Sequence, residues 1–223
     1  MTLEKKDFIE IEFTGKVKDG EIFDSNIKED LKELHSGHNH EIESTPFVFC
    51  LGENMFMKGV DEFLIGKDIG NYKISLPPEK AFGKRDPKLI RMVPIKEFSK
   101  NNLNPIPGST FNFDGKIAKV LTVSSGRVIV DFNHPISGKN VEYKIKVLRS
   151  INDLNEKIKA LNEFFFRTDF EFTTEENKLT LHVPKNTEQF VKIFKEKYKE
   201  ILNLELEVKE IEKKSKDLEE KKE

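Results

Sequence analysis

Residues 7–25, DFIEIEFTGKVKDGEIFDS, contain the pattern that decides the fold of the first part of the chain. Ile11 and Phe13 alternate with glutamates, which is typical of a strand that buries one face. Asp19-Gly20 is a strong signal for a tight turn, and Ile22-Phe23 can return as a second strand. The stretch therefore predicts a β-hairpin whose apolar residues face a core.

The segments that follow supply further strands and one short helix. A polar excursion covers 26–45, and the apolar run at 47–51 predicts a strand. A short amphipathic segment predicts a helix that ends at Gly66. Apolar residues alternate over 72–76, so we expect another strand there before the chain is broken by two prolines.

The middle of the chain, residues 88–131, has a pattern of its own. Prolines punctuate it, and the β-rich runs 117–123 and 127–132 are joined by Ser-Ser-Gly, which predicts a second hairpin. A last strand is expected at 141–149. The middle stretch therefore predicts a β-rich segment with a pattern distinct from the strands on either side of it.

From residue 150 the apolar period changes from 2 to about 3.6. One helix face is predicted from residues spaced by three and four positions, namely Ile151, Leu154, Ile158, Leu161 and Phe165. Two alternating strands follow, and then a second helix, predicted to be capped by Asn186 with Gln189 three residues on. This helix carries Phe190, Phe194, Tyr198 and Leu202, and a final strand carries Leu204, Leu206 and Val208. The order α-β-β-α-β predicts a two-layer module.

Composition excludes several classes of protein. Charged residues make up 35% of the chain and hydrophobic residues 36%, which is typical of a globular protein rather than a disordered one. The formal net charge of −2 gives no electrostatic field that would attract nucleic acid or an anionic membrane. Cys50 is the single cysteine, so no intrachain disulfide is possible. The N-terminus carries no apolar signal segment, and no apolar run approaches the roughly 18 residues of a membrane span. We expect a soluble, cytoplasmic protein.

Four ordered sets of motifs carry a resemblance to a known family. They are Phe13-Thr14-Gly15 with Asp19-Gly20 and Phe23-Asp24-Ser25; Pro46-Phe47 with Gly52, Lys58-Gly59-Val60 and Gly66; Pro77-Pro78-Glu79 with Ala81-Phe82-Gly83; and Asn133-His134-Pro135-Ile136-Ser137-Gly138 with Val141-Glu142-Tyr143. In this order they resemble an FK506-binding (FKBP) domain. The insertion after Gly83 and its Asn-His-Pro return are similar to the SlyD-like branch. The resemblance covers residues 7–150.

The resemblance and the pattern after residue 150 together predict an α+β fold with four parts, of which the resemblance implies the first two. An antiparallel sheet wrapped on a short helix would form the discontinuous isomerase domain at 1–87 and 132–150, and residues 88–131 would form the inserted small β chaperone domain. The two-layer α-β-β-α-β module occupies 151–211, and a charged tail occupies 212–223.

The resemblance also implies an activity, peptidyl-prolyl cis-trans isomerisation of unfolded or partly folded proteins, with no cofactor. By motif position, the pocket would consist of Phe13, Phe23, Asp24, Phe47, Phe56, Met57, Val60, Phe82 and Tyr143. A dry aromatic site suits the chemistry, because an amide twisted through 90° is less dipolar than a planar one. The family usually has tyrosine in place of Phe13 and Phe82 and often tryptophan in place of Val60. Weak macrolide binding is therefore expected, while isomerisation should survive.

The insertion has two interpretations. Its apolar residues could form an ordinary small core, or, as the resemblance implies, an exposed groove that grips unfolded chains. The candidates for contact with substrate are Ile95, Phe98, Leu103, Ile106, Phe111 and Phe113.

Two other functions remain open alongside the isomerase. Phe13 and Phe82 would also fit a holdase chaperone with a weakened isomerase pocket. His35, His38 and His40 lie close enough in sequence to hold nickel or zinc in a metal-handling protein, although the sequence favours a solvated loop without metal.

A homodimer through 151–211 is the expected assembly. Phe164, Phe165 and Phe166 stand in a row, and successive helical residues step by about 100°, so at least one of these rings should be exposed unless the helix ends early. A three-stranded sheet also leaves edges, which pairing with a second copy would cover.

Overall fold

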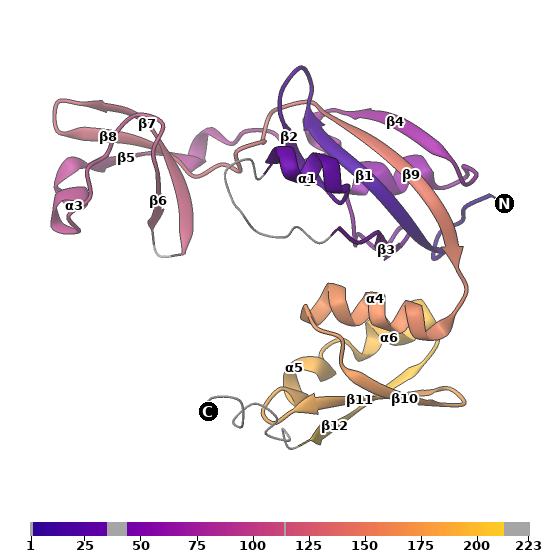
Figure 1. Cartoon of the computed structure of the whole chain (residues 1–223). Helices are drawn as coiled ribbons and strands as arrows, with labels where there is room; N and C mark the ends of the chain where they lie inside the picture. The colour runs from indigo at the N-terminus through magenta and orange to yellow at the C-terminus, as the bar shows by residue number, and fades with distance from the viewer. Residues whose placement is uncertain (1, 35–43, 114, 212–223) are drawn as a thin grey trace, which may run out of the picture.

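Three sheets organise the part of the chain that the structure, a computed structural model, describes: residues 2–34, 44–113 and 115–211. Figure 1 shows the first sheet between the other two, with the insertion to one side and the C-terminal module below. The mixed α+β class expected from the sequence is confirmed.

The first sheet is antiparallel and is built on one long strand, β1. Its members are β1 (Phe8–Val17), β2 (Ile22–Ser25), β3 (Phe47–Cys50), β4 (Asn71–Leu76) and β9 (Val141–Ile151), in the order β2-β1-β9-β4 with β3 also paired to β1. The last half of β1 pairs with β2 and its first half with β3, while β9 runs along its whole length.

A short helix, α2 (Lys58–Leu64), packs against this sheet, as the resemblance implied. Its close approach depends on Gly59, because a Cβ there would lie 2.6 Å from the carbonyl oxygen of Lys80 and 2.7 Å from the side chain of Leu76. The polar excursion contains a further helix, α1 (Lys28–Leu34), that the sequence did not predict. Asp30 on α1 accepts hydrogen bonds from Thr14 and Ser25, which hold the helix beside β2.

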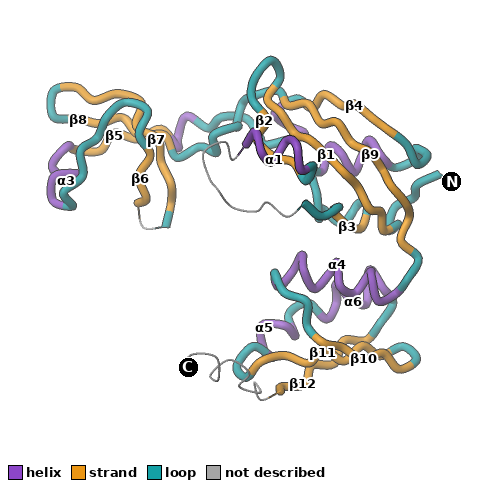
Figure 2. The backbone as a smooth tube through the Cα atoms, in the orientation of Figure 1, coloured by secondary structure: helices purple, strands orange, loops and turns teal. Residues whose placement is uncertain are grey.

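The insertion has a sheet and a core of its own. Its elements are the 3-10 helix η2 (Pro87–Leu89), β5 (Ile90–Pro94), α3 (Ile95–Lys100), β6 (Thr110–Phe113), β7 (Lys116–Ser124) and β8 (Arg127–Asp131), with strand order β5-β8-β7-β6. The buried residues are Phe98, Ala118, Val120, Val128 and Val130. Figure 2 shows that only two loop segments connect this sheet to the rest of the chain.

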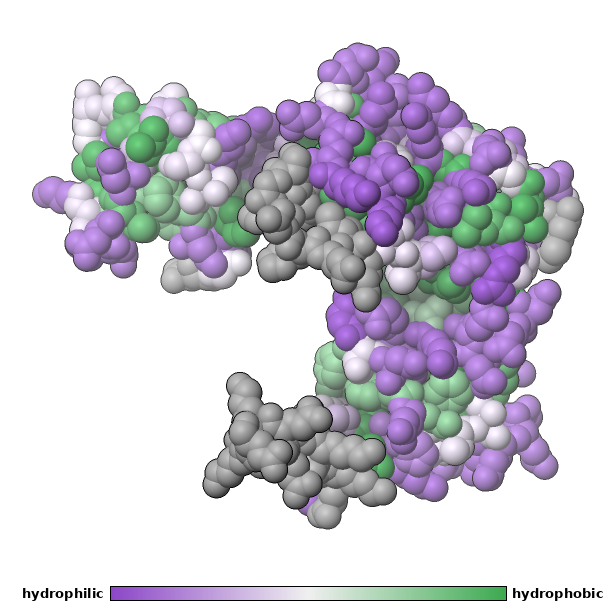
Figure 3. All heavy atoms as spheres, viewed as in Figure 1, coloured by the Kyte–Doolittle hydropathy of each residue, from purple (hydrophilic) through white to green (hydrophobic). Residues whose placement is uncertain are grey.

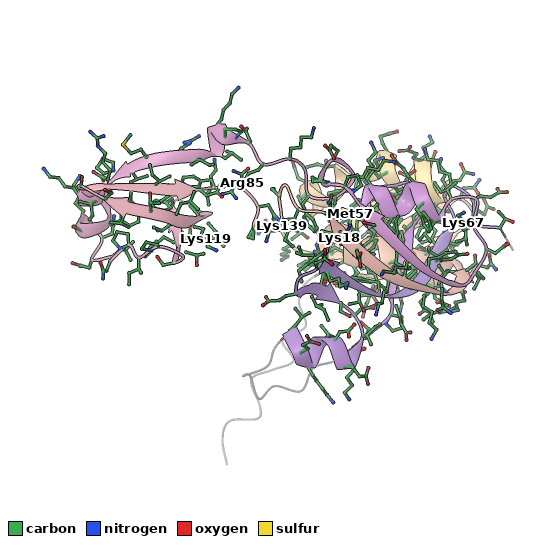
Figure 4. All side chains as sticks on the ribbon, turned by 90° about the horizontal axis from the view of Figure 1, so that it is seen from above. Lys18, Met57, Lys67, Arg85, Lys119 and Lys139 are labelled. Atoms are coloured by element: carbon green, nitrogen blue, oxygen red, sulfur yellow. The ribbon has the colours of Figure 1, made fainter. Side chains whose placement is uncertain are left out.

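Those two connections form a neck held by polar contacts. Arg85 forms an ion pair with Asp131, and Asp86 and Asn133 exchange hydrogen bonds of 2.8 and 3.0 Å between backbone and side-chain atoms. The 3-10 helix η1 (Pro78–Lys80) precedes the neck. Figure 4 shows Arg85 and Lys139 on the two connections, between the insertion and the main body.

The C-terminal module has the predicted order α-β-β-α-β, with the second helix divided in two. It consists of α4 (Leu154–Phe166), β10 (Glu171–Glu175), β11 (Lys178–Pro184), α5 (Glu188–Lys192), α6 (Lys195–Leu202) and β12 (Glu205–Ile211). The strand order is β10-β11-β12, with β12 parallel to β11. Ile158 and Leu161 of α4 belong to the same hydrophobic cluster as Phe8 and Phe49 of the first sheet, so the module and the first sheet share one continuous core.

Three details of the module correct the sequence-based expectations. Ile151 ends strand β9, and helix α4 begins only after Asp153, whose carboxylate accepts the N–H of Glu156. Asn186 does not cap the second helix: it has a positive φ of 68°, and Thr187 is the N-cap residue.

The row of phenylalanines is also partly buried throughout. The rings of Phe164, Phe165 and Phe166 are all half-buried, because α4 ends at Phe166 and the left-handed residue Arg167 turns the chain back over it. Phe166 then packs against Phe170. The expected exposed ring is therefore absent from this row.

Candidate active site

Aromatic rings from five separate segments form a continuous row on the first sheet. Phe13 on β1 lies at its centre, with ring centroids 4.8 Å from Phe56, 6.2 Å from Tyr143 and 6.5 Å from Phe47. Phe23 lies 5.8 Å from Tyr143. Edge-on contacts dominate, which is the arrangement that aromatic quadrupoles favour.

The row continues past β2 toward the insertion. Phe23 lies 5.3 Å from Phe82, and Phe82 in turn stacks on His134 at 4.8 Å with an angle of 6° between the ring planes. The sequence alone indicated His134 only as part of the Asn-His-Pro junction. The signal that could have revealed its position is its place in that return motif, which brings the chain back to the segment containing Phe82.

Gly15 allows the rings to approach the strand. A Cβ at this position would lie 2.8 Å from the Tyr143 ring and 3.0 Å from the Phe23 ring, closer than real Cβ contacts. The two aromatic side chains therefore lie directly over the backbone of β1. Any side chain at position 15 would push them apart.

Asp24 places a carboxylate beside the phenol of Tyr143. Burial raises the pKa of Asp24 above its usual value, although the side chain keeps contact with solvent and the N–H of Ser25 opposes the shift. Burial also raises the pKa of Tyr143, and the charge of Asp24 adds to the effect. Tyr143 therefore stays a neutral phenol and a hydrogen-bond donor.

Met57 and Val60 come from the start of α2. Met57 is the N-cap residue of the helix, and its carbonyl accepts the N–H groups of Val60 and Asp61. No hydrogen bond from the N–H of Met57 is found within the described part of the chain. Val60 is fully buried, and Figure 4 marks Met57 on the main body.

The structure brings the predicted pocket residues together. All of them except Asp24 belong to one hydrophobic cluster, either as buried members or packed against it: Phe13, Phe23, Phe47, Phe56, Met57, Val60, Phe82 and Tyr143. Asp24 joins the site through its electrostatic effect on Tyr143.

The candidate contact residues of the insertion divide into core and surface. Phe98 is 1% exposed and packs against the rings of Phe111 and Phe113, so its assignment to an exposed groove is corrected: it is the centre of the insertion's own core. Leu103 and Ile106 are exposed, and Ile95 is half-buried.

Two further apolar residues of the insertion are exposed and were not singled out from the sequence. Met92 lies on β5 opposite Ile129 of β8, on the face turned away from the Phe98 core, and Ile117 lies on β7. Figure 3 shows hydrophobic colour on the surface of the insertion. A single exposed apolar residue in a strand produces no periodic pattern of its own. The sequence therefore did not indicate that Met92 and Ile117 would be exposed.

The metal hypothesis lies outside the described residues, because His35, His38 and His40 all fall in 35–43. Among the residues that the structure describes, no group of three or more potential metal ligands is found. None of the described helices is long and apolar enough to cross a membrane.

Comparison with known proteins gives a consistent set of relatives. The family model for the FKBP26 IF domain matches residues 91–136. The short-type peptidyl-prolyl cis-trans isomerase of Methanocaldococcus jannaschii is 33% identical over 146 residues, covering 65% of this chain and 92% of the relative. The FKBP-type 16 kDa peptidyl-prolyl cis-trans isomerase of Escherichia coli is 32% identical over 109 residues, covering 46% and 72%.

Two more distant matches are also found. The SlyD isomerase of Helicobacter pylori is 29% identical over 111 residues, covering 48% of this chain and 60% of the relative. The crystal structure of the three FKBP domains of wheat FKBP73 matches with a TM-score of 0.35 and 18% identity, covering 69% of this chain and 42% of the other.

Proposed function

Because the chain belongs to the FKBP-type peptidyl-prolyl cis-trans isomerases, we propose that it accelerates rotation about Xaa-Pro bonds in unfolded and partly folded polypeptides at the aromatic row. The observation that carries the proposed location is the ring network that joins Phe13, Tyr143, Phe23 and Phe82.

The chemistry needs no nucleophile and no metal. Rotation about the peptide bond meets a barrier of about 18–20 kcal/mol because the planar amide is stabilised by resonance. The twisted amide has lost this resonance and is less dipolar, so a site with little water favours it over the planar ground state. Rings packed edge to face supply such an environment.

Polar groups at the margin of the rings would hold the substrate. The N–H of Met57 is the proposed donor to a substrate carbonyl, which is consistent with its lack of a partner within the described residues. Burial raises the pKa of Tyr143 and the charge of Asp24 adds to this shift, so the phenol remains a donor at the edge of the pocket. Hydrogen bonds from these two fixed donors would hold the substrate on one side, so that rotation takes place about the Xaa-Pro bond.

Single substitutions in the pocket test the location. We expect Phe23→Ala and Asp24→Ala each to lower kcat/KM on a short proline peptide by at least about tenfold, or roughly 1.4 kcal/mol of transition-state stabilisation. Phe172→Ala in the C-terminal module is the matched control, because Phe172 is also half-buried but lies on β10.

Melting temperatures separate catalysis from folding in these variants. Asp24 is exposed, so Asp24→Ala should fold like the parent chain. An unchanged rate in both pocket variants would place the active site elsewhere.

The insertion is proposed to capture the client polypeptide. Its exposed apolar residues, Met92, Leu103, Ile106 and Ile117, give it a surface that unfolded chains can cover. Because the insertion is tethered beside the pocket, capture would raise the local concentration of Xaa-Pro segments without a new catalytic contact.

A homodimer through the C-terminal module is proposed as the assembly. The support comes from α5 and its C-cap residue, since Phe190 is 53% exposed and Ile193 is 74% exposed, and from β10 and β12, which are both edges of the three-stranded sheet. The open face of this sheet is polar, since Thr173, Thr180 and Glu207 lie in one row across it. Contact through α5 is therefore more favourable than contact through the sheet face.

A reducing compartment, the cytoplasm, is the proposed location. Cys50 is buried, and burial raises the pKa of its thiol to about 12, so it is protonated and unreactive at neutral pH. A protein without disulfides suits that compartment.

A further inference from the structure

A groove of about 630 Å³ runs between strand β3 and helix α4. Phe47 and Val48 of β3 form one wall, and Ala160 and Phe164 of α4 form the other. This volume falls within the roughly 300–1,000 Å³ that is typical of ligand sites. In Figure 1, the two elements whose side chains line this groove, β3 and α4, lie on the facing sides of the first sheet and the C-terminal module.

The backbone of β3 exposes an unpaired edge to this groove. Among the residues that the structure describes, β3 pairs on one side only, with β1. The N–H of Leu51 donates to the Asp7 carbonyl, at the β1 end of that ladder, while the N–H of Cys50 turns away to the sulfur of Met55. Since bonding directions alternate along an antiparallel strand, Val48 shares the outward orientation of Cys50. Its N–H and C=O therefore face away from β1.

Val48 is the part of this edge that stays open. No hydrogen bond of its N–H or C=O is found in the described part of the chain, whereas Met55 occupies the outer N–H of Cys50. An open edge of this kind can bind an extended polypeptide as an added strand.

The groove continues directly from the aromatic row. Phe47 is a wall of the groove, and its ring also lies 5.6 Å from Phe56 and 6.5 Å from Phe13. A polypeptide that places a proline against the rings can therefore extend into the groove without leaving the surface.

The rim of the groove is charged, whereas its walls are apolar. Lys159 pairs with Asp169 at 3.4 Å, and Arg149 binds Glu156 at 2.6 Å. These pairs leave the rim with balanced charge. The groove thus selects for an extended backbone with apolar side chains rather than for a charged ligand.

We propose that this groove is a second subsite for the substrate, in which the residues on one side of the proline bind as a short extra strand on β3. The inference rests on the proposed function, because it identifies the substrate segment that this enzyme holds beyond the proline. Alternate side chains of the bound segment point to opposite faces, so one set contacts Ala160 and Phe164 and the other faces the rings around Phe47.

The test compares short and long substrates. A tetrapeptide with one proline reaches the pocket alone, and two longer peptides carry five apolar or polar uncharged residues before or after the same tetrapeptide. We expect one of the two extensions, and only one, to raise kcat/KM by at least about fivefold, the order of two net hydrogen bonds.

Two variants disable the groove without changing a pocket residue, one by filling it and one by removing a hydrogen-bond donor. Ala160→Arg fills it from α4, and Asn155→Arg is the matched control, because Asn155 is exposed on the same helix and does not line the groove. Val48→Pro removes the outward N–H while leaving the bonds to β1, which is the one place where an edge strand accepts proline. Melting temperatures verify that each variant folds.

The proposal expects a specific pattern. Ala160→Arg and Val48→Pro abolish the rise in kcat/KM that the extension gives and leave kcat/KM on the tetrapeptide unchanged. Asn155→Arg keeps the rise and the tetrapeptide value. If neither extension raises kcat/KM, or if the gain persists in both folded groove variants, the groove is not a subsite. A parent chain that fails on the tetrapeptide as well would instead contradict the proposed function. Loss of a dimer in Ala160→Arg, measured by light scattering, would assign the groove to a second copy and overturn the proposal.

Discussion

Asp61 is the most unusual single residue of the described chain. It lies on α2, is 3% exposed, and accepts the N–H of Gly52 at 3.1 Å through Oδ2. Its Oδ1 is buried without a hydrogen-bond partner in the described part of the chain. Burial raises the pKa of Asp61 to about 6, while the N–H groups of Gly52 and Asn54 oppose the shift. The carboxylate thus anchors the loop that leads to Phe56 and Met57, at a cost in stability.

The expected consequence is a stability that falls as the pH rises through the acid range. Between about pH 4 and 6 the folded state holds the Asp61 proton and the unfolded state does not, so folding loses free energy as the pH rises. The loss is on the order of 3 kcal/mol at neutral pH. Asp61→Asn keeps an acceptor for Gly52 and removes the charge, so this variant should be more stable than the parent chain at pH 7.

Urea unfolding at pH 4 and pH 7 measures this effect. The advantage of Asp61→Asn should be largest at pH 7 and nearly absent at pH 4, and Glu21→Gln, which removes an exposed carboxyl, should show neither effect. A variant that is less stable than the parent at both pH values would mean that the carboxylate contributes more through its hydrogen bonds than it loses by burial.

At the same scale, the sequence located the ring residues but not the groups that position them. Phe13 and Tyr143 follow from ordered motifs, because the spacing along paired strands brings them together. The stacking of His134 on Phe82 depends on how the neck closes, and the burial of Asp61 depends on the packing of α2. Both are set by contacts distant in sequence, which local patterns do not record.

At the scale of elements, the strands were predictable and the helix ends were not. Alternation over 72–76 and 141–149 matched β4 and β9, because one face of each strand is buried against the same core. The helical spacing of Ile151 was coincidental: that residue completes the β1–β9 ladder opposite Phe8. Asn186 resembled a cap but adopts the left-handed conformation that asparagine also favours in turns.

The insertion is the element whose removal separates capture from catalysis. Replacing 88–131 with a short turn should keep activity on a tetrapeptide within about tenfold and abolish most of the advantage on a proline-limited refolding protein, since the tethering effect is lost. The core of the first sheet shares no buried residue with the insertion core, so the shortened chain should fold.

The matched control for this shortened chain keeps the insertion and changes only its surface. Met92→Ser with Ile117→Ser removes two exposed apolar side chains and leaves Phe98 in place. Both the shortened chain and this double variant should lose activity on a refolding protein while keeping activity on the tetrapeptide. An equal fall of peptide and protein activity after removal of 88–131 would make the insertion a structural element alone.

At the scale of the whole molecule, the proposed dimer predicts twice the monomer mass at micromolar concentration. Light scattering measures this, and Phe190→Glu with Ile193→Glu should produce a monomer, because two charges would have to be buried at the contact. Met92→Glu with Ile117→Glu, equally exposed but on the insertion, should leave the mass unchanged. A parent chain that is monomeric at these concentrations would contradict the proposed assembly.

The neck between the insertion and the first sheet also bears on how this chain itself folds. β1 and β9 form the most extensive ladder, yet the whole insertion separates them in sequence. The insertion has a core of its own, and Asp86 and Asn133 tie its two ends together, so it can fold early and shorten the loop that the ladder must close. Each halving of a loop lowers the closure cost by about 0.6 kcal/mol, and we expect this gain to act on the formation of the β1–β9 ladder. Phe98→Ala should therefore slow refolding of the first sheet, measured by stopped-flow fluorescence of a tryptophan placed there, more than it speeds unfolding. The insertion, which is proposed to bind other polypeptides, would then first assist the folding of its own chain by bringing β1 and β9 together.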